Sequence, residues 1–441
     1  MHFDLILRNA KRIFPWGGSV GDVAVHGGKI VSFSPVAQDT AEEEVDLSGL
    51  HLLPGLMDSH VHLREPGKEH AETIATGAKG AALGGLTTIL DMPNNTPPTI
   101  DNDSLSYKVE RARQEALVNI GFYMGASQQN IAHLAALECL EGVCAIKVFA
   151  GSSTGDLLIG DEAGIRKVLQ TGHRRVAFHA EDEDRLQERA KTYRHSGASY
   201  STHEVWRDVD CALFATKKIL KLAHEEKRPI HILHVTTAEE MALLGQHRAF
   251  ATCEVLANHL TLHSPECYEK LGGMAVLNPP LRGKAHQDAL WQGLRDGRVD
   301  VLSSDHAPHA LEEKEREWSA CSSGLTGIQT LLPIMLDHVN AGRLTLERLV
   351  DLMAAGPARV YGMPTKGRLA VGYDADFTIV DMKKEAKISK EKLVSPCGWS
   401  PFDGKSIRGW PVMTIVNGQI VMREHEITAS KAVGKLPLFF S

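Results

Sequence analysis

Residues 58–65 have the sequence Asp-Ser-His-Val-His-Leu-Arg-Glu and follow an apolar run at 52–57 that predicts a buried strand. Because side chains alternate along a strand, His60 and His62 point to the same side. Two neutral imidazoles on one face, at the carboxyl end of a strand, can bind one metal ion. Arg64 continues the alternation, and its guanidinium can bind a carboxylate. Alternatively, the two histidines have only a structural role. Further potential ligands at the ends of other strands would favour the metal site over this alternative.

Strand-like runs alternate with helical stretches through the middle of the chain. The strand-like runs are 52–62, 86–93, 119–126, 145–150, 174–180, 229–236, 251–257 and 299–305. The helical stretches include 71–83, 104–117, 206–227 and 286–296. Eight such units predict a TIM-like (β/α)8 barrel, an α/β fold. A doubly wound open sheet is the alternative, but no Gly-x-Gly-x-x-Gly follows the first strand.

The two ends of the chain have a different pattern, with short strands and hairpin turns. Gly27-Gly28 lies between strand-like runs near the N-terminus, and Asn417-Gly418 lies between two more near the C-terminus. Segments at opposite ends of a chain can complete one domain, since termini often lie close together. We therefore expect residues 1–52 and 360–441 to form a small β-sandwich domain, and residues 53–359 to form the barrel.

Composition narrows the functional classes. The chain has 441 residues with 48 Lys and Arg against 55 Asp and Glu, a net charge of −7 that argues against a nucleic-acid or anionic-membrane surface. Seven cysteines without a regular framework indicate reduced thiols in a cytoplasmic protein. The first residues lack the basic region of a signal peptide, and no apolar run reaches the ~18 residues of a membrane helix.

Potential metal ligands follow several predicted strands. The strand-end side chains are His60, His62, His179, His234 and Asp305. In a barrel of parallel strands these ends meet at one face, where the working residues of such folds lie. Four His and one Asp brought together there predict a metal site.

Lys147 lies inside an apolar strand, where a bare ammonium is costly to bury. One interpretation is that its charge extends out of the strand end into solvent. The other is that burial lowers its pKa and exposes a neutral amine, which can add carbon dioxide to give an anionic carbamate. The carbamate could bridge two ions, with His60, His62 and Asp305 on one and His179 and His234 on the other.

Some of these residues, His60, His62 and Asp305, lie in motifs by which the chain resembles the amidohydrolase superfamily, and within it the dihydroorotases. The resemblance covers nearly the whole chain. Its motifs are 58–67 (Asp-Ser-His-Val-His-Leu-Arg-Glu-Pro-Gly), 92–94 (Met-Pro-Asn), 278–282 (Asn-Pro-Pro-Leu-Arg), 305–309 (Asp-His-Ala-Pro-His) and 372–376 (Gly-Tyr-Asp-Ala-Asp).

The resemblance implies reversible ring closure of N-carbamoyl-L-aspartate to L-dihydroorotate, a step of pyrimidine synthesis. It implies two zinc ions, with Arg64, Asn94 and His309 on the substrate carboxylate and Asn278 on the ring. Asp305 would carry the proton between water and the ring nitrogen. Beyond the small-molecule substrate, a homodimer or higher homo-oligomer and an association with aspartate transcarbamoylase are the partners that the resemblance suggests.

The loop after Lys147 leaves the bridging ligand open. Some dihydroorotases of this long type lack the lysine and use a loop aspartate, and this chain also has Asp156 in such a loop. We favour Lys147 because of its place within the strand. Ser152, Ser153 and Thr154 would then form a loop that closes over the substrate, unless it is a plain flexible connection.

Two functional alternatives remain. Another cyclic amidase, such as a hydantoinase, dihydropyrimidinase or allantoinase, would share the metal site but need no carboxylate-binding Arg64 and Asn94. A non-catalytic scaffold for aspartate transcarbamoylase would have lost ligands, whereas this chain retains every expected one. Among the remaining polar residues, the sequence predicts that His203 and the acidic run 181–184 are solvated.

Overall fold

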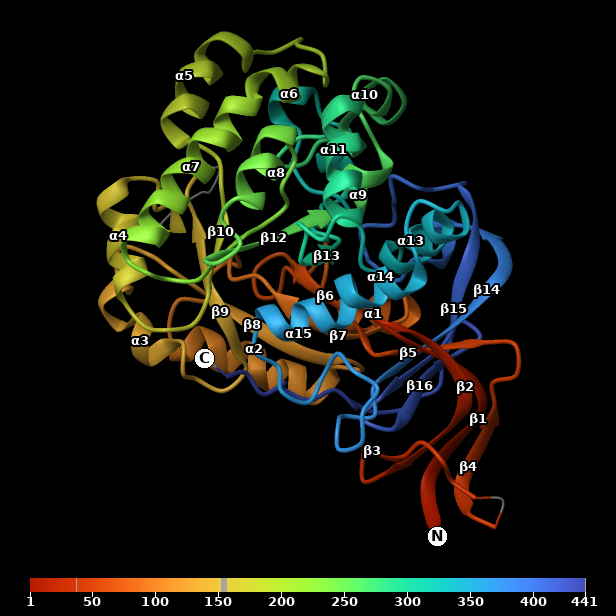
Figure 1. Ribbon diagram of the computed structural model, residues 1–441. Coiled ribbons are helices and arrows are strands. Elements are labelled where there is room, and N and C mark those ends of the chain that lie inside the picture. The colour runs from red at the N-terminus through yellow and green to blue at the C-terminus, as the bar shows by residue number, and fades with distance from the viewer. Residues whose placement is uncertain (37, 152–156, 441) are drawn as a thin grey trace.

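The computed structural model describes residues 1–36, 38–151 and 157–440, and in this part of the chain eight parallel strands form one sheet in chain order (Figure 1). The parallel pairing and the burial of nearly every strand residue confirm the predicted barrel. A parallel bridge between Val61 and His306 joins the first strand to the segment after the last. The strands are β6 (Leu56–Val61), β7 (Leu86–Asp91), β8 (Asn119–Gly125), β9 (Val143–Phe149), β10 (Val176–His179), β11 (Ile230–Ile232), β12 (Ala251–Leu256) and β13 (Val301–Ser303).

Helices cover the outside of this sheet (Figure 1), and several begin at the kind of residue that favours a helix start. Thr73, Asp101, Asp208 and Thr237 each accept a hydrogen bond from a backbone N–H of the first turn. The predicted helical stretches are confirmed within a few residues. The helices are α1 (Ile74–Leu83), α2 (Asn102–Glu115), α3 (Leu134–Leu137), α4 (Glu162–Gln170), α5 (Glu183–Tyr193), α6 (Thr202–Trp206), α7 (Val209–Glu225), α8 (Ala238–Gly245), α9 (Ala257–Thr261), α10 (Glu266–Leu271), α11 (Lys284–Arg295), α12 (Leu311–Lys314), α13 (Leu331–Asn340), α14 (Leu346–Val350) and α15 (Gly356–Val360).

The two ends of the chain form a second sheet with its own core, at the lower right of Figure 1. Strand β5 joins the ends, since it pairs with β1 on one side and β14 on the other. Both predicted hairpin turns are present, with left-handed backbone at Gly27, Gly28, Asn417 and Gly418. The strands are β1 (His2–Phe14), β2 (Gly17–His26), β3 (Lys29–Ser32), β4 (Thr40–Asp46), β5 (His51–Pro54), β14 (Phe377–Lys387), β15 (Ser406–Val416), β16 (Gln419–Arg423) and β17 (Glu426–Ile427).

The apolar run before the first histidine pair is divided between the two sheets. We expected one strand over 52–62, but β5 ends at Pro54 and β6 begins at Leu56. Gly55 separates them, and its N–H donates to Asp376 O at 2.8 Å. A Cβ at Gly55 would collide with Thr87 and Asp376, so this crossing point requires a glycine.

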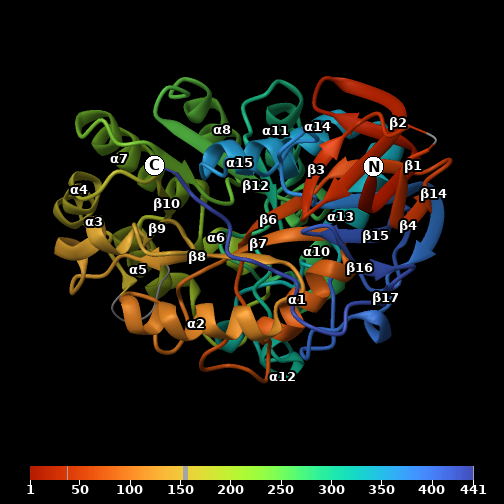
Figure 2. The ribbon, with the colours of Figure 1, turned by 90° about the horizontal axis from the view of Figure 1, so that it is seen from below.

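The C-terminal segment passes beneath the barrel, across the amino-terminal ends of its strands (Figure 2). The N–H of Ile120, at the start of β8, donates to Lys435 O at 3.2 Å, and Phe440 N donates to Gly362 O at 2.8 Å. Phe439 packs in the same buried cluster as Tyr123. The segment therefore closes the end of the barrel opposite to the one where the predicted ligands lie.

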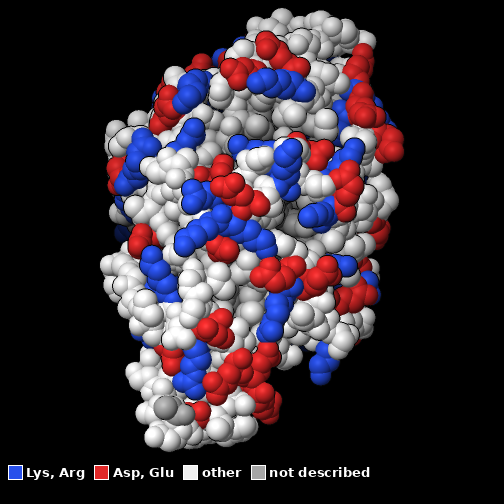
Figure 3. Space-filling view, turned by 90° about the vertical axis from the view of Figure 1, so that its right-hand side faces the viewer, with Lys and Arg blue, Asp and Glu red and all other residues white. Residues whose placement is uncertain are grey.

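The surface carries charges of both signs. On the face shown in Figure 3, the described basic and acidic side chains are interspersed rather than gathered into broad areas of one sign. Among the helices of the described residues, none is both long and apolar enough to cross a membrane.

Candidate active site

A cavity of about 570 Å³ opens at the carboxyl ends of the barrel strands. Ten residues singled out from the sequence line it, although they come from distant parts of the chain. These are His60, His62, Arg64, Asn94, Lys147, His179, His234, Asn278, Asp305 and His309. The remaining candidates, Ser152, Ser153, Thr154 and Asp156, lie outside the described residues.

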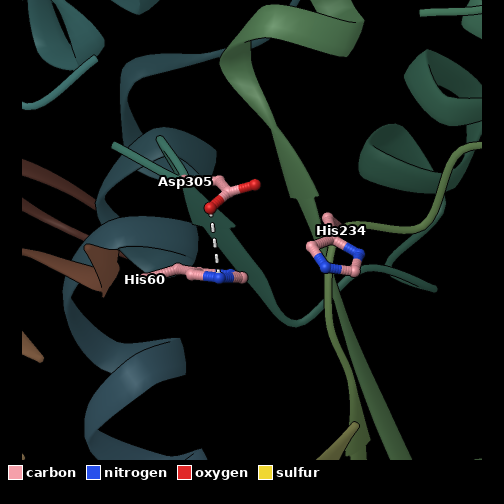
Figure 4. Close-up of side chains that lie close together, drawn as sticks. All are labelled: His60, His234 and Asp305. Carbon is pink, nitrogen blue, oxygen red and sulfur yellow. Dashed lines mark ion pairs between the residues drawn. The ribbon is translucent and has the colours of Figure 1, made fainter. Parts of the chain in front are cut away.

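Three of the expected ligands that line this cavity, His60, His234 and Asp305, lie close together (Figure 4). Asp305 Oδ1 lies 3.2 Å from His60 Nε2 and 3.1 Å from His62 Nε2. One potential ligand atom each from His60, His234 and Asp305 lies within 4.8 Å of the others. The ring centroids of His179 and His234 are 4.6 Å apart, so all five strand-end side chains form one cluster.

Hydrogen-bond acceptors orient three of these imidazoles: the buried carboxylates of Glu254 and Glu181, and the partly exposed amide of Asn94. His60 Nδ1 donates to Glu254 Oε1 at 2.6 Å, and His62 Nδ1 donates to Asn94 Oδ1 at 2.7 Å. His179 Nε2 donates to Glu181 Oε2 at 2.8 Å. In each bond the donating ring nitrogen carries the proton, so the other ring nitrogen has a lone pair. This is the arrangement that metal-binding histidines adopt in proteins.

The electrostatics of the cluster also suit a cation. Burial lowers the pKa of His62 to about 3 and lowers the pKa of His234 well below its usual value, so both rings are neutral. His234 Nδ1 is buried without a hydrogen-bond partner among the described residues. Burial alone would raise the pKa of Asp305, but His60 and His62 lower it well below its usual value. Neutral imidazoles around one ionised carboxylate are a donor set that fits zinc.

Lys147 reaches this cluster from the middle of the barrel wall. Its side chain is only 1% exposed, and burial lowers its pKa to about 7. Within the described residues its Nζ makes no hydrogen bond or ion pair and lies 4.5 Å from the centre of the Phe149 ring. A buried cation without an anionic contact is unfavourable, whereas a neutral amine in this position is not. The structure therefore places the Lys147 amine beside the histidine cluster, in surroundings that favour its neutral form.

A second group of polar side chains forms another wall of the cavity. Arg64 Nε donates to Pro308 O at 3.0 Å, and its Nη2 lies 3.2 Å from His309 Nε2. Burial lowers the pKa of Arg64 to about 10, so the guanidinium remains protonated near neutral pH. Burial and the Arg64 charge lower the pKa of His309 to about 2, so that ring is neutral. Asn94 Oδ1 is taken by His62, which leaves its amide N–H groups as donors.

Left-handed backbone occurs at three described residues of the cavity other than glycine. The φ angles are +58° at Arg64, +38° at His234 and +48° at Asp305. Such conformations cost of order 1–3 kcal/mol each for residues other than glycine, and they persist where the surrounding structure holds them. Three residues whose chemistry the sequence had singled out therefore have strained backbone.

Asn278 lines the cavity and is held from behind by His203. The Nε2 of His203 donates to Leu277 O at 2.9 Å and Asn278 Oδ1 at 3.0 Å, while its Nδ1 accepts from Trp318 Nε1 at 3.2 Å. The prediction that His203 is solvated is wrong, because the ring is buried. Its partners come from residues more than 70 positions away, which no local pattern reveals.

Two buried glutamates complete the site, and the sequence analysis missed both. Glu181 was predicted to be solvated, but it is fully buried between His179 and Arg207, whose Nη1 lies 2.5 Å from its Oε2. Glu254 contacts His60 from β12. A signal for Glu254 was present, since it is an acid inside a buried apolar strand, the same anomaly that identified Lys147.

Comparisons with known proteins agree with this geometry. A sequence model of the amidohydrolase family matches residues 51–421. A dihydroorotase from Halobacterium salinarum is 36% identical over 93% of this chain and 96% of its own length. An allantoinase from Deinococcus radiodurans is 33% identical over 98% of both chains. The solved L-hydantoinase (dihydropyrimidinase) from Arthrobacter aurescens superposes with a TM-score of 0.93 at 29% identity, covering 98% of this chain and 99% of that one.

Proposed function

The chain belongs to the amidohydrolase family and is a cyclic amide hydrolase, and we propose that it is a dihydroorotase. It would interconvert L-dihydroorotate and N-carbamoyl-L-aspartate, a step of pyrimidine synthesis. The observation that carries this proposal is the protonated Arg64 beside His309 and Asn94 in the wall of the cavity. Dihydroorotate has a ring carboxylate that these donors fit, whereas dihydrouracil and hydantoin have none.

The residues at the bottom of the cavity fit two zinc ions. His60, His62 and Asp305 would hold one ion and His179 and His234 the other, with Lys147 as a carbamate bridging both. When bound, such ions polarise an amide carbonyl and lower the pKa of a water molecule. The support is the donor set, three of whose rings are oriented by hydrogen-bond acceptors.

The protein's own side chains would do the rest. Asp305 is ionised and lies at the cavity floor, so it can accept a proton as water adds to the ring carbonyl and deliver it to the departing ring nitrogen. In the biosynthetic direction the same carboxylate returns the proton to the oxygen that leaves as water. Arg64, Asn94 and His309 would hold the carboxylate and Asn278 the ring, which aligns the amide with the reacting atoms.

A second candidate is a cyclic amidase for another ring, and the allantoinase and hydantoinase relatives favour it. One half of the cavity, here called the ligand half, contains the metal-ligand candidates His60, His62, Lys147, His179, His234 and Asp305. It would serve any of these reactions. A non-catalytic scaffold fits less well, because all the described ligand candidates are present and lie together. The other half, here called the carboxylate-binding half, contains Arg64, Asn94 and His309. It is what would distinguish a dihydroorotase from the other cyclic amidases.

The test is a side-by-side assay of the purified protein on L-dihydroorotate, dihydrouracil, hydantoin and allantoin, with zinc content measured on the same sample. We expect hydrolysis of dihydroorotate to dominate. If dihydrouracil, hydantoin or allantoin is hydrolysed as fast as dihydroorotate, the proposal is wrong and the second candidate replaces it. A sample that binds no zinc and hydrolyses none of the rings would indicate a scaffold.

A further inference from the structure

Helix α2 packs against the two loops that carry Arg64 and Asn94. It presents three polar side chains to them, Tyr107, Lys108 and Arg111. Positions 107 and 111 are four residues apart, and 108 and 111 are three apart, so all three lie on neighbouring parts of one helix face. Lys108 is fully buried, which is rare for a lysine and requires compensating contacts.

Among the described residues, the hydrogen bonds and the ion pair of Lys108 are with the end of β7 and the loop that follows it, and its Nζ also lies 5.2 Å from the centre of the Phe122 ring in β8. Its Nζ lies 2.5 Å from Asp91 Oδ2 and donates to Asn95 Oδ1 at 2.9 Å, Met92 O at 3.1 Å and Thr99 Oγ1 at 3.3 Å. Met92 and Asn95 lie on either side of Asn94 in the sequence. One ammonium group therefore fixes the backbone and side chains that flank this cavity residue.

The same contacts extend to the loop after β6. Asp91 Oδ1 accepts from Leu63 N at 2.8 Å, and Asn95 Nδ2 donates to Glu65 O at 2.9 Å. Leu63 and Glu65 are the two neighbours of Arg64. Both sides of Arg64 are thus held by side chains that Lys108 itself contacts.

Arg111 and Tyr107 add a second tie from the same helix face. Arg111 Nε donates to Glu65 Oε1 at 2.7 Å, and Tyr107 Oη donates to the same oxygen at 3.3 Å. The other carboxylate oxygen of Glu65 accepts from Ile74 N at 2.8 Å. Glu65 is therefore fixed at both oxygens, which helps to hold Arg64 in its left-handed conformation.

We infer that this face of α2 sets the position of Arg64 and Asn94, with Lys108 as the central positioning residue for carboxylate recognition. Lys108 is not among the described residues that line the cavity, so it acts through the two loops rather than on the substrate. Two of the metal-ligand candidates depend on other groups, since Glu254 and Glu181 orient His60 and His179, and only His62 shares a contact with Asn94 among the described residues. Loss of Lys108 should therefore weaken carboxylate recognition more than the chemical step. The inference rests on the proposed function.

The experiment compares Lys108→Met with a matched control, Lys366→Met. Lys366 is also a buried lysine paired with an aspartate, Asp376 at 2.6 Å. Asp376 Oδ2 also accepts from Asn119, at the amino-terminal start of β8, so this pair lies at the opposite end of the barrel from the cavity. The control accounts for the general cost of breaking such a pair. We measure kcat and KM for L-dihydroorotate and dihydrouracil, and zinc content, for each variant and the wild type.

In Lys108→Met we expect KM for dihydroorotate to rise about tenfold to a hundredfold, because small displacements of positioning groups have effects of this size. In the same variant the zinc content, kcat for dihydroorotate, and kcat/KM for dihydrouracil should each change less than about threefold. Lys366→Met should retain the wild-type KM for dihydroorotate. An unchanged KM in Lys108→Met, or an equal rise in Lys366→Met, overturns the inference.

Two further results keep the test decisive. If Lys108→Met does not fold, Arg111→Met is the second variant. Arg111 is partly exposed, and its substitution removes the tie to Glu65 together with a pair to Glu115 on the same helix, so KM should rise about threefold to tenfold in the same selective way. An unchanged KM there also overturns the inference. Failure of the proposed function is seen separately, in a wild type without preference for dihydroorotate. Failure of the inference is seen in a wild type that has the preference and a Lys108→Met variant that keeps it.

Discussion

The two halves of the cavity are built differently. The ligand half consists of side chains at strand ends, and buried Glu254 and Glu181 orient two of its imidazoles. The proposed carboxylate-binding half consists of Arg64, Asn94 and His309 on loops, held by α2 and by backbone carbonyl groups such as Pro308 O. The first half belongs to the barrel itself, whereas the second depends on connections that can change without altering the barrel.

This difference gives a physical reason why similar chains have different substrates. The dihydroorotase, allantoinase and hydantoinase relatives align along nearly the whole chain, so overall likeness does not identify the ring. Active sites of barrel enzymes diversify through their loops while the strands remain. The ligand half should therefore determine whether an amide is hydrolysed, and the other half should determine which amide.

Removal of the metal should have the largest effect, because it disables the ligand half entirely. Treatment with a chelator followed by dialysis should lower activity on every ring by about a thousandfold or more, and zinc should restore it. Elemental analysis should give about two zinc ions per chain before treatment. Full activity in a thoroughly metal-free sample would contradict the proposed site.

Lys147→Ala tests the bridge within the same half. The variant should lose activity on dihydroorotate by about a thousandfold or more, since a bridging anion is lost from between two cations. Bicarbonate with a short carboxylic acid should restore part of the activity by supplying a replacement anion. The comparison variant is Asp156→Ala, which should keep its activity. The opposite result would assign the bridge to Asp156.

Much of the ligand half could be predicted from the sequence, for a physical reason. Parallel strands bring their carboxyl ends together, so a histidine or aspartate after a buried run has a predictable destination. What could not be predicted depends on tertiary contacts. The division of the first run at Gly55 follows from its close approach to Thr87 and Asp376. Burial of His203 follows from residues near 277 and 318.

The carboxylate-binding half was less accessible to sequence reasoning. Alternation along the strand predicted that Arg64 faces the site, and it does line the cavity, but through a left-handed backbone that ends the alternation. The sequence of a loop has no regular hydrophobic periodicity from which the direction of a side chain can be inferred. The buried lysine in α2 that holds these loops cannot be distinguished in the sequence from a solvated helix residue.

Arg64→Met separates the two halves directly. A partly buried guanidinium that is left without a carboxylate keeps a charge that no anion compensates, which disfavours rings that lack this group. We expect the wild type to prefer dihydroorotate over dihydrouracil by at least about a thousandfold, on the order of 4 kcal/mol. The variant should lose most of this preference and keep both zinc ions. The check is kcat/KM for both rings with zinc analysis, and loss of zinc would mean that the halves are not independent.

Glu254→Gln should have the smallest effect, because it perturbs the ligand half without removing a ligand. Burial alone would raise the pKa of Glu254, but His60 and His231 lower it to about 2, so its carboxylate is ionised beside the His60 N–H. Glutamine keeps an acceptor but removes the charge that makes His60 a stronger donor to zinc. Apparent zinc affinity should fall about tenfold to a hundredfold, while the ratio of kcat/KM between rings stays constant at saturating zinc.

The matched control is Glu240→Gln, which changes a buried glutamate that is hydrogen-bonded to Thr237 outside the cavity. Equal loss of zinc affinity in both variants would show a general response to losing a buried carboxylate rather than orientation of His60.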